Sequence, residues 1–433
     1  MNKQILRLAI PNILSNLSIP LLSSVDTAVM GHLNSEVYLG AIALGSMIFN
    51  FIYWGFGFLR MGTTGLTAQV FGSKNNSEIQ NTLFRSVLIG VSLGFVLFFL
   101  QNIIAEISFY LIKGSPEVEN YASEYFYIRI FAAPATLAMY SIHGWFLGMQ
   151  NSKYPLYISL FVNILNIILN LFFVYQLDMK VSGIALGTVI SQYLGLIFSI
   201  ILIVKSYSNY LSKINFRKII DKEKLIRFFK VNTDIFIRTL LLIFAISFFT
   251  AKSAEFDNVT LAANFILFQL WLIVSYGVDG FAFAAESLVG KYIGANENSN
   301  VKKVIKFSFY WGISLSAFLG VVYFFFENEI LKIYTNQTEV IETAMVFMIW
   351  IVFSPIINSI SFIWDGIFIG ATKTREMLIS MIMSVLVFFL PSYYITKDVF
   401  GNHSIWFALT IFMVMRGLTL SIFYFTKFKK QLN

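Results

Sequence analysis

The side chains most able to do chemistry in this sequence are polar residues that stand inside long apolar segments. Asp26 lies in the first of these, residues 6–30, which is long enough to cross a bilayer. An ionised aspartate near the centre of a membrane helix costs about 2.5–3.5 kcal/mol. Because uptake of a proton removes that cost, we expect Asp26 to be a proton carrier. The alternative is a buried carboxylate that neighbouring hydroxyl groups or an arginine satisfy.

Further polar residues accompany Asp26 on one helical face. They follow one another at steps of four, four, three and four: Asn12, Asn16, Pro20, Ser23 and Thr27. This spacing predicts that the face lines the protein interior or water rather than lipid. Pro20 and Pro11 each remove a backbone hydrogen bond, so we expect the helix to bend at them.

A second polar face consists of three asparagines. Asn163, Asn166 and Asn170 are spaced three and four residues apart within an apolar segment. Amides at this depth either bond between helices or line a hydrated cavity, and the sequence leaves both possibilities open.

A third group of charged residues suggests a gate. Asp279 and Glu286 are seven residues apart on one face, and Arg60 ends the second apolar segment. We expect Arg60 to contact one of these acids across the two halves of the chain, either as a gate or as a static ion pair. Asp234 and Arg238 have the spacing of an ordinary ion pair within one helix.

His143 and Asp365 occupy equivalent positions in the two halves of the chain. They could relay protons. The alternative is that His143 is a buried histidine satisfied by hydrogen bonds, which is the more common situation.

The composition identifies the class of protein. Of 433 residues, 57% are hydrophobic and 12% are charged, and the mean hydropathy is +0.73. Soluble domains carry about 25% charged residues, so this is a multi-span membrane protein. Cysteine is absent, which excludes disulfides and thiolate metal sites. No nucleotide-binding or hydrolase motif is present, so we expect no enzyme activity and no cofactor, and an ion gradient as the energy source.

Twelve apolar windows predict twelve membrane helices, and we interpret the first as a retained span rather than a signal peptide. The windows cover residues 6–30, 38–62, 82–105, 121–147, 155–176, 182–204, 226–250, 259–284, 304–326, 340–370, 377–396 and 404–426. Basic residues concentrate in alternate connections, which places both termini in the cytoplasm. The net charge of +8 therefore reflects topology, with membrane lipid and not nucleic acid as the partner.

The two halves of the chain repeat each other at an offset of 222 residues. "HGWFLGMQNSK" at 143–153 aligns with "DGIFIGATKTR" at 365–375, and further glycines match at the same offset. Six spans in each half make a parallel repeat with a pseudo-two-fold axis along the membrane normal. We therefore predict an all-α protein with an N-terminal lobe (1–205), a cytoplasmic linker (206–224) and a C-terminal lobe (225–433), with a central cleft between the lobes.

Several motifs together resemble the multidrug and toxic compound extrusion (MATE) transporters, in particular their DinF-like branch. The motifs are "IPLLSSVDTAVMGHL", "YLGAIALG", "FLRMGTTGLTAQVFG", "NTDIFIRTL", "VDGFAFAAESLVGKYIG" and "DGIFIGATKT". The resemblance implies two six-helix lobes in the inner membrane. It also implies that Asp26 is the coupling residue and that Pro11 is the proline at which the first helix bends.

The resemblance also implies an asparagine followed four residues later by an aspartate in the fifth span. Asn166 matches this pattern, but Asn170 stands where the acid is usual. This departure disfavours a two-carboxylate Na⁺ site and favours a proton site at Asp26.

The function implied is a monomeric antiporter that exports amphipathic, cationic organic compounds in exchange for H⁺, with Na⁺ as the alternative ion. A second possibility is a lipid-linked sugar flippase, which would need a more basic cavity. A third is a membrane scaffold or channel without coupled transport, which would need no titratable acid.

Overall fold

The computed structural model describes residues 1–31, 36–213 and 215–432, with the side chains of residues 19–31 outside the description. Within these ranges all regular secondary structure is helical, and no strand is present. Eleven helical segments of the described residues are long and apolar enough to cross a membrane. Together with α1 (Asn2–Gly31), which covers the first predicted span, they confirm the predicted all-α polytopic fold.

The chain divides into two compact units. The N-terminal unit is Leu14–Phe229, and the C-terminal unit is Met1–Ile13 together with Lys230–Asn433. Two helices therefore belong to both units, namely α1 and α11 (Lys222–Ser253). The first thirteen residues pack with the C-terminal unit, whereas the sequence places them in the first lobe.

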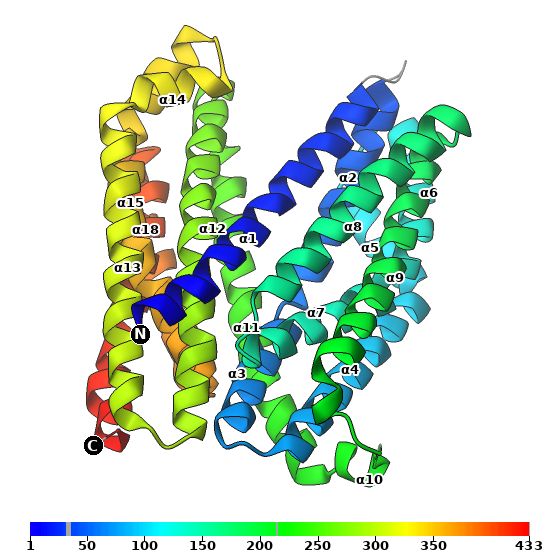
Figure 1. Ribbon diagram of the computed structural model, residues 1–433. Coiled ribbons are helices and arrows are strands. Elements are labelled where there is room, and N and C mark those ends of the chain that lie inside the picture. The colour runs from blue at the N-terminus through cyan, green and yellow to red at the C-terminus, as the bar shows by residue number, and fades with distance from the viewer. Residues whose placement is uncertain (32–35, 214, 433) are drawn as a thin grey trace. The chain divides into compact units, whose positions relative to one another are not determined.

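Each unit is built from helices that run alongside one another (Figure 1). The helices of the N-terminal unit are α2 (Glu36–Gly55), α3 (Phe58–Gly72), α4 (Asn76–Phe99), α5 (Gln101–Leu111), α6 (Pro116–Arg129), η1 (Ile130–Ala132), α7 (Ala133–Gly148), α8 (Lys153–Leu171), η2 (Phe172–Gln176), α9 (Lys180–Tyr207), η3 (Ser208–Tyr210) and α10 (Phe216–Ile219). Those of the C-terminal unit are α12 (Asn258–Gly294), α13 (Asn298–Phe325), α14 (Glu327–Tyr334), α15 (Thr338–Gly370), α16 (Thr374–Ile382), η4 (Met383–Phe389), α17 (Leu390–Phe400), α18 (His403–Phe423), η5 (Tyr424–Phe428) and α19 (Lys429–Gln431).

Side-chain caps fix where several of these helices begin. The Ser115 hydroxyl accepts a hydrogen bond from the backbone N–H of Val118, and Pro116 follows at the first helical position of α6. Asp257 likewise accepts from the backbone N–H of Thr260 at the start of α12. These are the residue types that satisfy the unpaired N–H groups of a first helical turn.

The two units contain the same helix crossings at the predicted offset. A β-carbon on Gly144 would lie 2.3 Å from the carbonyl oxygen of Arg60, and one on Gly366 would lie 2.2 Å from that of Ala282. Both glycines and both carbonyl groups are 222 residues apart. In each unit, glycine is therefore required for two helices to approach closely, which confirms the repeat.

The turns that follow these helices repeat as well. Lys74 and Asn296 have φ angles of 56° and 58°, and Gln150 and Thr372 have φ angles of 63° and 51°. Each pair is again 222 residues apart. Because residues other than glycine rarely adopt such angles, their recurrence at one offset reflects a duplicated backbone.

Candidate coupling site and buried polar networks

The polar face of α1 is described up to Ser18. Asn12 is buried, and its amide donates to the carbonyl of Leu8 at 2.9 Å. Pro11 and Asn16 are half-buried on the same helix. The side chains of Pro20, Ser23, Asp26 and Thr27 lie outside the described residues, so the coupling role of Asp26 and the helix bends stay predictions.

The asparagine face of α8 joins helices of the N-terminal unit to one another. The Asn163 amide donates to the Ser18 hydroxyl on α1 at 3.3 Å. Asn166 donates to Thr188 on α9 at 3.0 Å, and Asn170 donates to Asn166 at 3.1 Å. The bonds of Asn163 and Asn166 connect different helices, which is the first of the two possibilities that the sequence left open. A role in lining a cavity stays a prediction.

Asn170 also depends on a neighbour that the sequence pattern did not reveal. A β-carbon on Gly187 would lie 2.3 Å from the Asn170 side-chain oxygen, so only glycine leaves room for this amide. Asn166 and Asn170 are both buried. The position where an acid is usual in the resembled family is therefore occupied by a closely packed amide.

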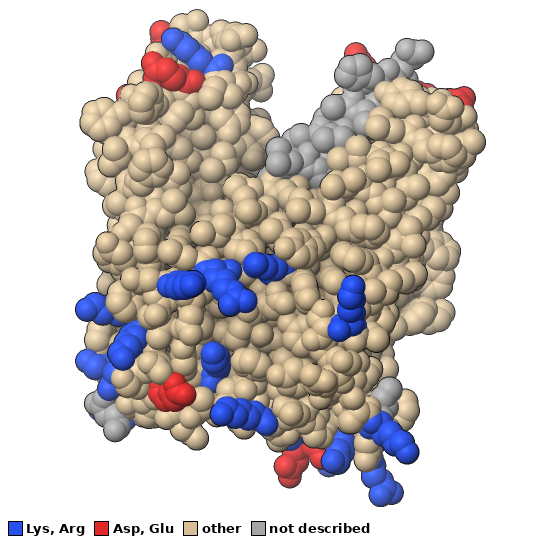
Figure 2. Space-filling model, viewed as in Figure 1, with Lys and Arg blue, Asp and Glu red and all other residues tan. Residues whose placement is uncertain are grey.

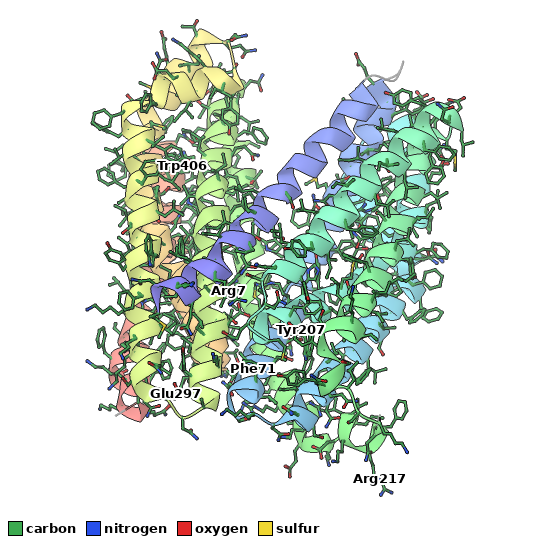
Figure 3. All side chains as sticks on the ribbon, viewed as in Figure 1. Arg7, Phe71, Tyr207, Arg217, Glu297 and Trp406 are labelled. Carbon is green, nitrogen blue, oxygen red and sulfur yellow. The ribbon has the colours of Figure 1, made fainter. Side chains whose placement is uncertain are left out.

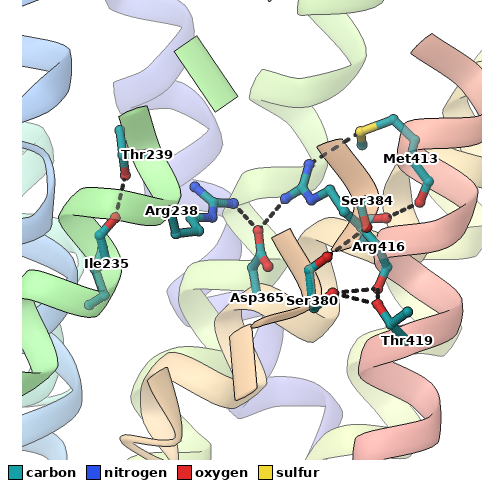
Figure 4. A network of polar contacts seen from close by, with 10 residues as sticks. Ile235, Arg238, Thr239, Asp365, Ser380, Ser384, Met413, Arg416 and Thr419 are labelled. Carbon is teal, nitrogen blue, oxygen red and sulfur yellow. Dashed lines mark hydrogen bonds and ion pairs between the residues drawn. The ribbon is translucent and has the colours of Figure 1, made fainter. Parts of the chain in front are cut away.

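The C-terminal unit contains a buried ionic network centred on Asp365 (Figure 4). One oxygen of Asp365, on α15, accepts from Arg238 on α11 and from Arg416 on α18, the latter at 2.5 Å. All three residues are at most 6% exposed. Asp365 thus joins three helices through a single carboxylate oxygen, and we name these three residues the Asp365 network.

The Arg416 side chain is held by further contacts. Its guanidinium group lies 5.2 Å from the centre of the Phe412 ring and donates to the sulfur of Met413 at 3.2 Å. Its backbone carbonyl accepts from the Ser380 hydroxyl, which also bonds to Thr419 at 2.5 Å. No sequence pattern pointed to Arg416, Ser380 or Thr419, although all three lie in predicted spans.

The ion pair predicted between Asp234 and Arg238 is wrong. Asp234 accepts from the Thr374 hydroxyl at 2.9 Å and lies 3.7 Å from Arg375. Arg238 instead pairs with Asp365. Spacing along one helix allowed the pair, but packing of α11 against α15 and α16 gives each residue a different partner.

The predicted relay residues belong to separate units. His143 lies on α7 in the N-terminal unit, half-buried, and its Nε2 atom has no hydrogen-bond partner among the described residues. Asp365 carries the ion pairs above. Gly144 and Gly366 directly follow His143 and Asp365, and they make equivalent close contacts in the two units, which supports the alignment of His143 with Asp365. A proton relay through these two residues stays a prediction.

The residues of the predicted gate also lie in different units. Arg60 lies in the first turn of α3 in the N-terminal unit, while Asp279 and Glu286 lie on α12 in the C-terminal unit. Glu286 is 1% exposed. The contact of Arg60 with either acid stays a prediction.

Buried acids are distributed unequally between the units. The described part of the N-terminal unit buries no carboxylate, whereas the C-terminal unit buries Asp234, Glu286 and Asp365. Within the described chain, no group of three or more histidines and acids is arranged to hold a metal ion.

These features define a class of protein: a polytopic α-helical membrane protein, duplicated internally, with charged residues buried inside its spans. The family model MatE matches residues 11–172 and 235–395, which is most of the chain and both copies of the repeat. The chain belongs to the MatE family of transporters, as the sequence motifs predicted.

Similarity to individual proteins extends over nearly the whole chain. DNA damage-inducible protein F of Escherichia coli (strain K12) is 34% identical, with 97% of this chain and 91% of that protein covered. Probable multidrug resistance protein NorM of Thermotoga maritima is 22% identical, with 98% and 92% covered.

Solved structures match the fold closely. A MATE structure in complex with MaL6 has a TM-score of 0.89 at 17% identity, covering 99% of this chain and 96% of that one. The bent form of the Vibrio cholerae MATE transporter VcmN has a TM-score of 0.86 at 18% identity, covering 100% and 97%.

Proposed function

We propose that the protein is a secondary antiporter that exports amphipathic, cationic organic compounds in exchange for protons by alternating access. Membership of the MatE family is the observation that carries this proposal, because the family consists of transporters. The similarity to a protein named as a probable multidrug resistance protein supports small organic compounds as substrates.

Asp26 is the residue to which we assign proton coupling. The described residues of the N-terminal unit bury no carboxylate, and Asn170 occupies the position of a possible second acid in α8. The predicted spans of that unit contain one acid besides Asp26, namely Glu124, and the side chain of Glu124 is exposed. A single acid binds either a proton or a cationic substrate, so export of one is coupled to uptake of the other.

The proposed setting is the inner membrane, with both termini in the cytoplasm and a monomer as the working unit. Basic connections on one side of the twelve spans support this orientation.

The test is efflux of a cationic dye from proteoliposomes driven by a pH gradient alone or by a Na⁺ gradient alone. We expect efflux with the pH gradient and none with the Na⁺ gradient. Efflux driven only by Na⁺ would reassign the coupling ion. Transport of a lipid-linked sugar without dye efflux would favour the flippase.

A matched pair of variants tests the coupling residue. Asp26→Asn should abolish pH-driven efflux while the purified protein keeps its elution volume and melting temperature. Asp398→Asn, which changes an exposed acid on α17, should leave efflux unchanged. Efflux at the unmodified rate in Asp26→Asn would remove the coupling role.

A further inference from the structure

The segment between α9 and α11 is fastened to α4 from its buried side. We name residues 208–213 and 215–220 the linker elbow. Arg85 of α4 is only 4% exposed, and its guanidinium group donates to the backbone carbonyls of Lys218 and Ile219, each at 2.9 Å. It also pairs with Glu78 at 3.0 Å. A buried arginine therefore holds the α10 end of the linker elbow.

A second residue of α4 holds the middle of the linker elbow, at Ser212. The Gln80 amide donates to the carbonyl of Ser212 at 2.9 Å, and its oxygen accepts from the Ser212 backbone N–H at 3.0 Å and hydroxyl at 2.7 Å. Ile219 is buried at 3% exposure. Bonds to α4 thus fix the linker elbow at Ser212 and at Lys218 and Ile219, so one face of α10 points consistently away from α4.

That outward face is both apolar and basic. Phe216 is 68% exposed and Ile220 is 57% exposed, although they lie in a polar connection between spans. Figure 2 shows lysine and arginine side chains gathered where α10 lies in Figure 1, and Figure 3 shows Arg217 pointing away from the helices. The exposed basic residues of the linker elbow are Lys213, Arg217 and Lys218, and three more follow in the first two turns of α11, namely Lys222, Lys224 and Arg227.

The acidic residues of this stretch do not balance the positive charge. Residues 213–227 contain two acids, Asp221 and Glu223, against six basic residues. Asp221 is engaged as a cap, because its side chain accepts from the backbone N–H of Lys224 at 3.0 Å. The surface therefore presents two large apolar side chains surrounded by an excess of cations.

We propose that the linker elbow is a docking surface for anionic lipid headgroups of the membrane leaflet next to it. Apolar side chains that enter the interface and cations that bind lipid phosphates are the two features that anchor a segment to an anionic membrane surface. Arg85 and Gln80 hold Phe216 and Ile220 in position for insertion. This role goes beyond the proposed transport function and does not depend on it.

The chain has no cysteine, so a single introduced cysteine can report on this surface. Phe216→Cys, labelled with the polarity-sensitive dye acrylodan, is placed in nanodiscs of phosphatidylcholine with increasing fractions of phosphatidylglycerol. We expect a blue shift of the emission that grows with phosphatidylglycerol and weakens at high salt. Ile220→Cys is the second reporter if the first variant does not fold. Ser77→Cys, an exposed position of α4, is the control and should show no shift.

Charge removal tests the recognition of the headgroup. Lys213→Gln, Arg217→Gln and Lys222→Gln, added singly to the reporter variant, should each raise the half-maximal phosphatidylglycerol fraction by up to about fivefold. Equal shifts in phosphatidylcholine and phosphatidylglycerol, or emission typical of water in both, would overturn the proposal. Retention of the elution volume separates loss of lipid binding from loss of folding.

Discussion

Removal of the Asp365 carboxylate should destabilise the C-terminal unit strongly. In the structure, this group is the acid that pairs with both Arg238 and Arg416, and all three side chains are buried. Asp365→Asn would leave two buried guanidinium groups without their ion-pair partner. Removing one partner of a buried ion pair typically costs about 3–5 kcal/mol. For a unit of this size, that loss corresponds to a fall in melting temperature on the order of 10 °C.

Intrinsic tryptophan fluorescence during heating is a suitable assay. Five of the seven tryptophans lie in the C-terminal unit, at positions 271, 311, 350, 364 and 406, so the signal reports mainly on that unit. The matched control is Asp398→Asn, which removes the same charge from an exposed position. It should change the melting temperature by no more than a degree or two, since exposed ion pairs contribute little.

A compensated variant separates the loss of pairing from a general sensitivity of the site. Replacing all three charges at once, as Arg238→Met, Asp365→Leu and Arg416→Met, removes both the pairs and the cost of burying them. Such replacements are often neutral or stabilising, so the triple variant should melt above Asp365→Asn. If Asp365→Asn and the Asp398→Asn control have the same melting temperature, the Asp365 network does not stabilise the C-terminal unit and this prediction is refuted.

Three further predictions concern packing, amide bonding and a helix cap. Gly366→Ala should cost at least about 1–3 kcal/mol of stability, because the added β-carbon would overlap the Ala282 carbonyl. The control is Gly277→Ala, whose added β-carbon would have its nearest contact at 3.4 Å. It should cost far less stability in the same melting assay. Asn166→Ala should lower stability by about 1 kcal/mol, because the hydrogen bonds to Thr188 and Asn170 are lost. The control is Ile168→Ala, at a position that is 56% exposed. An equal loss of stability in Ile168→Ala would contradict this prediction. Hydrogen bonds from Thr260 lower the pKa of Asp257, so the cap is present above the usual pKa of an aspartate and is lost as pH falls through the lowered value. The test compares the rate of amide hydrogen exchange at the start of α12 in the unmodified protein with the rate in Asp257→Asn. The ratio of the first rate to the second should rise as the pH falls. A ratio that does not change with pH would contradict the cap.

The sequence by itself determined the class, the spans and the duplication of this protein. Hydropathy acts locally along the chain, and a membrane helix must satisfy its backbone hydrogen bonds within itself, so long apolar windows predict helices directly. The repeated glycines mark close helix crossings, because only glycine lets two backbones approach so closely. Gly144 and Gly366 therefore carried structural information that could be recognised without coordinates.

Only the tertiary structure decided which buried polar groups meet. Arg238 is 127 residues from Asp365, and Arg416 is 51 residues away, so no local spacing pointed to the Asp365 network. The local rule instead paired Arg238 with Asp234, which bonds to Thr374. The linker elbow is similar, since Arg85 reaches a carbonyl 134 residues away. Ion pairs and side-chain bonds between helices depend on how each helix is rotated and packed, and the linear pattern of residue types does not contain that rotation.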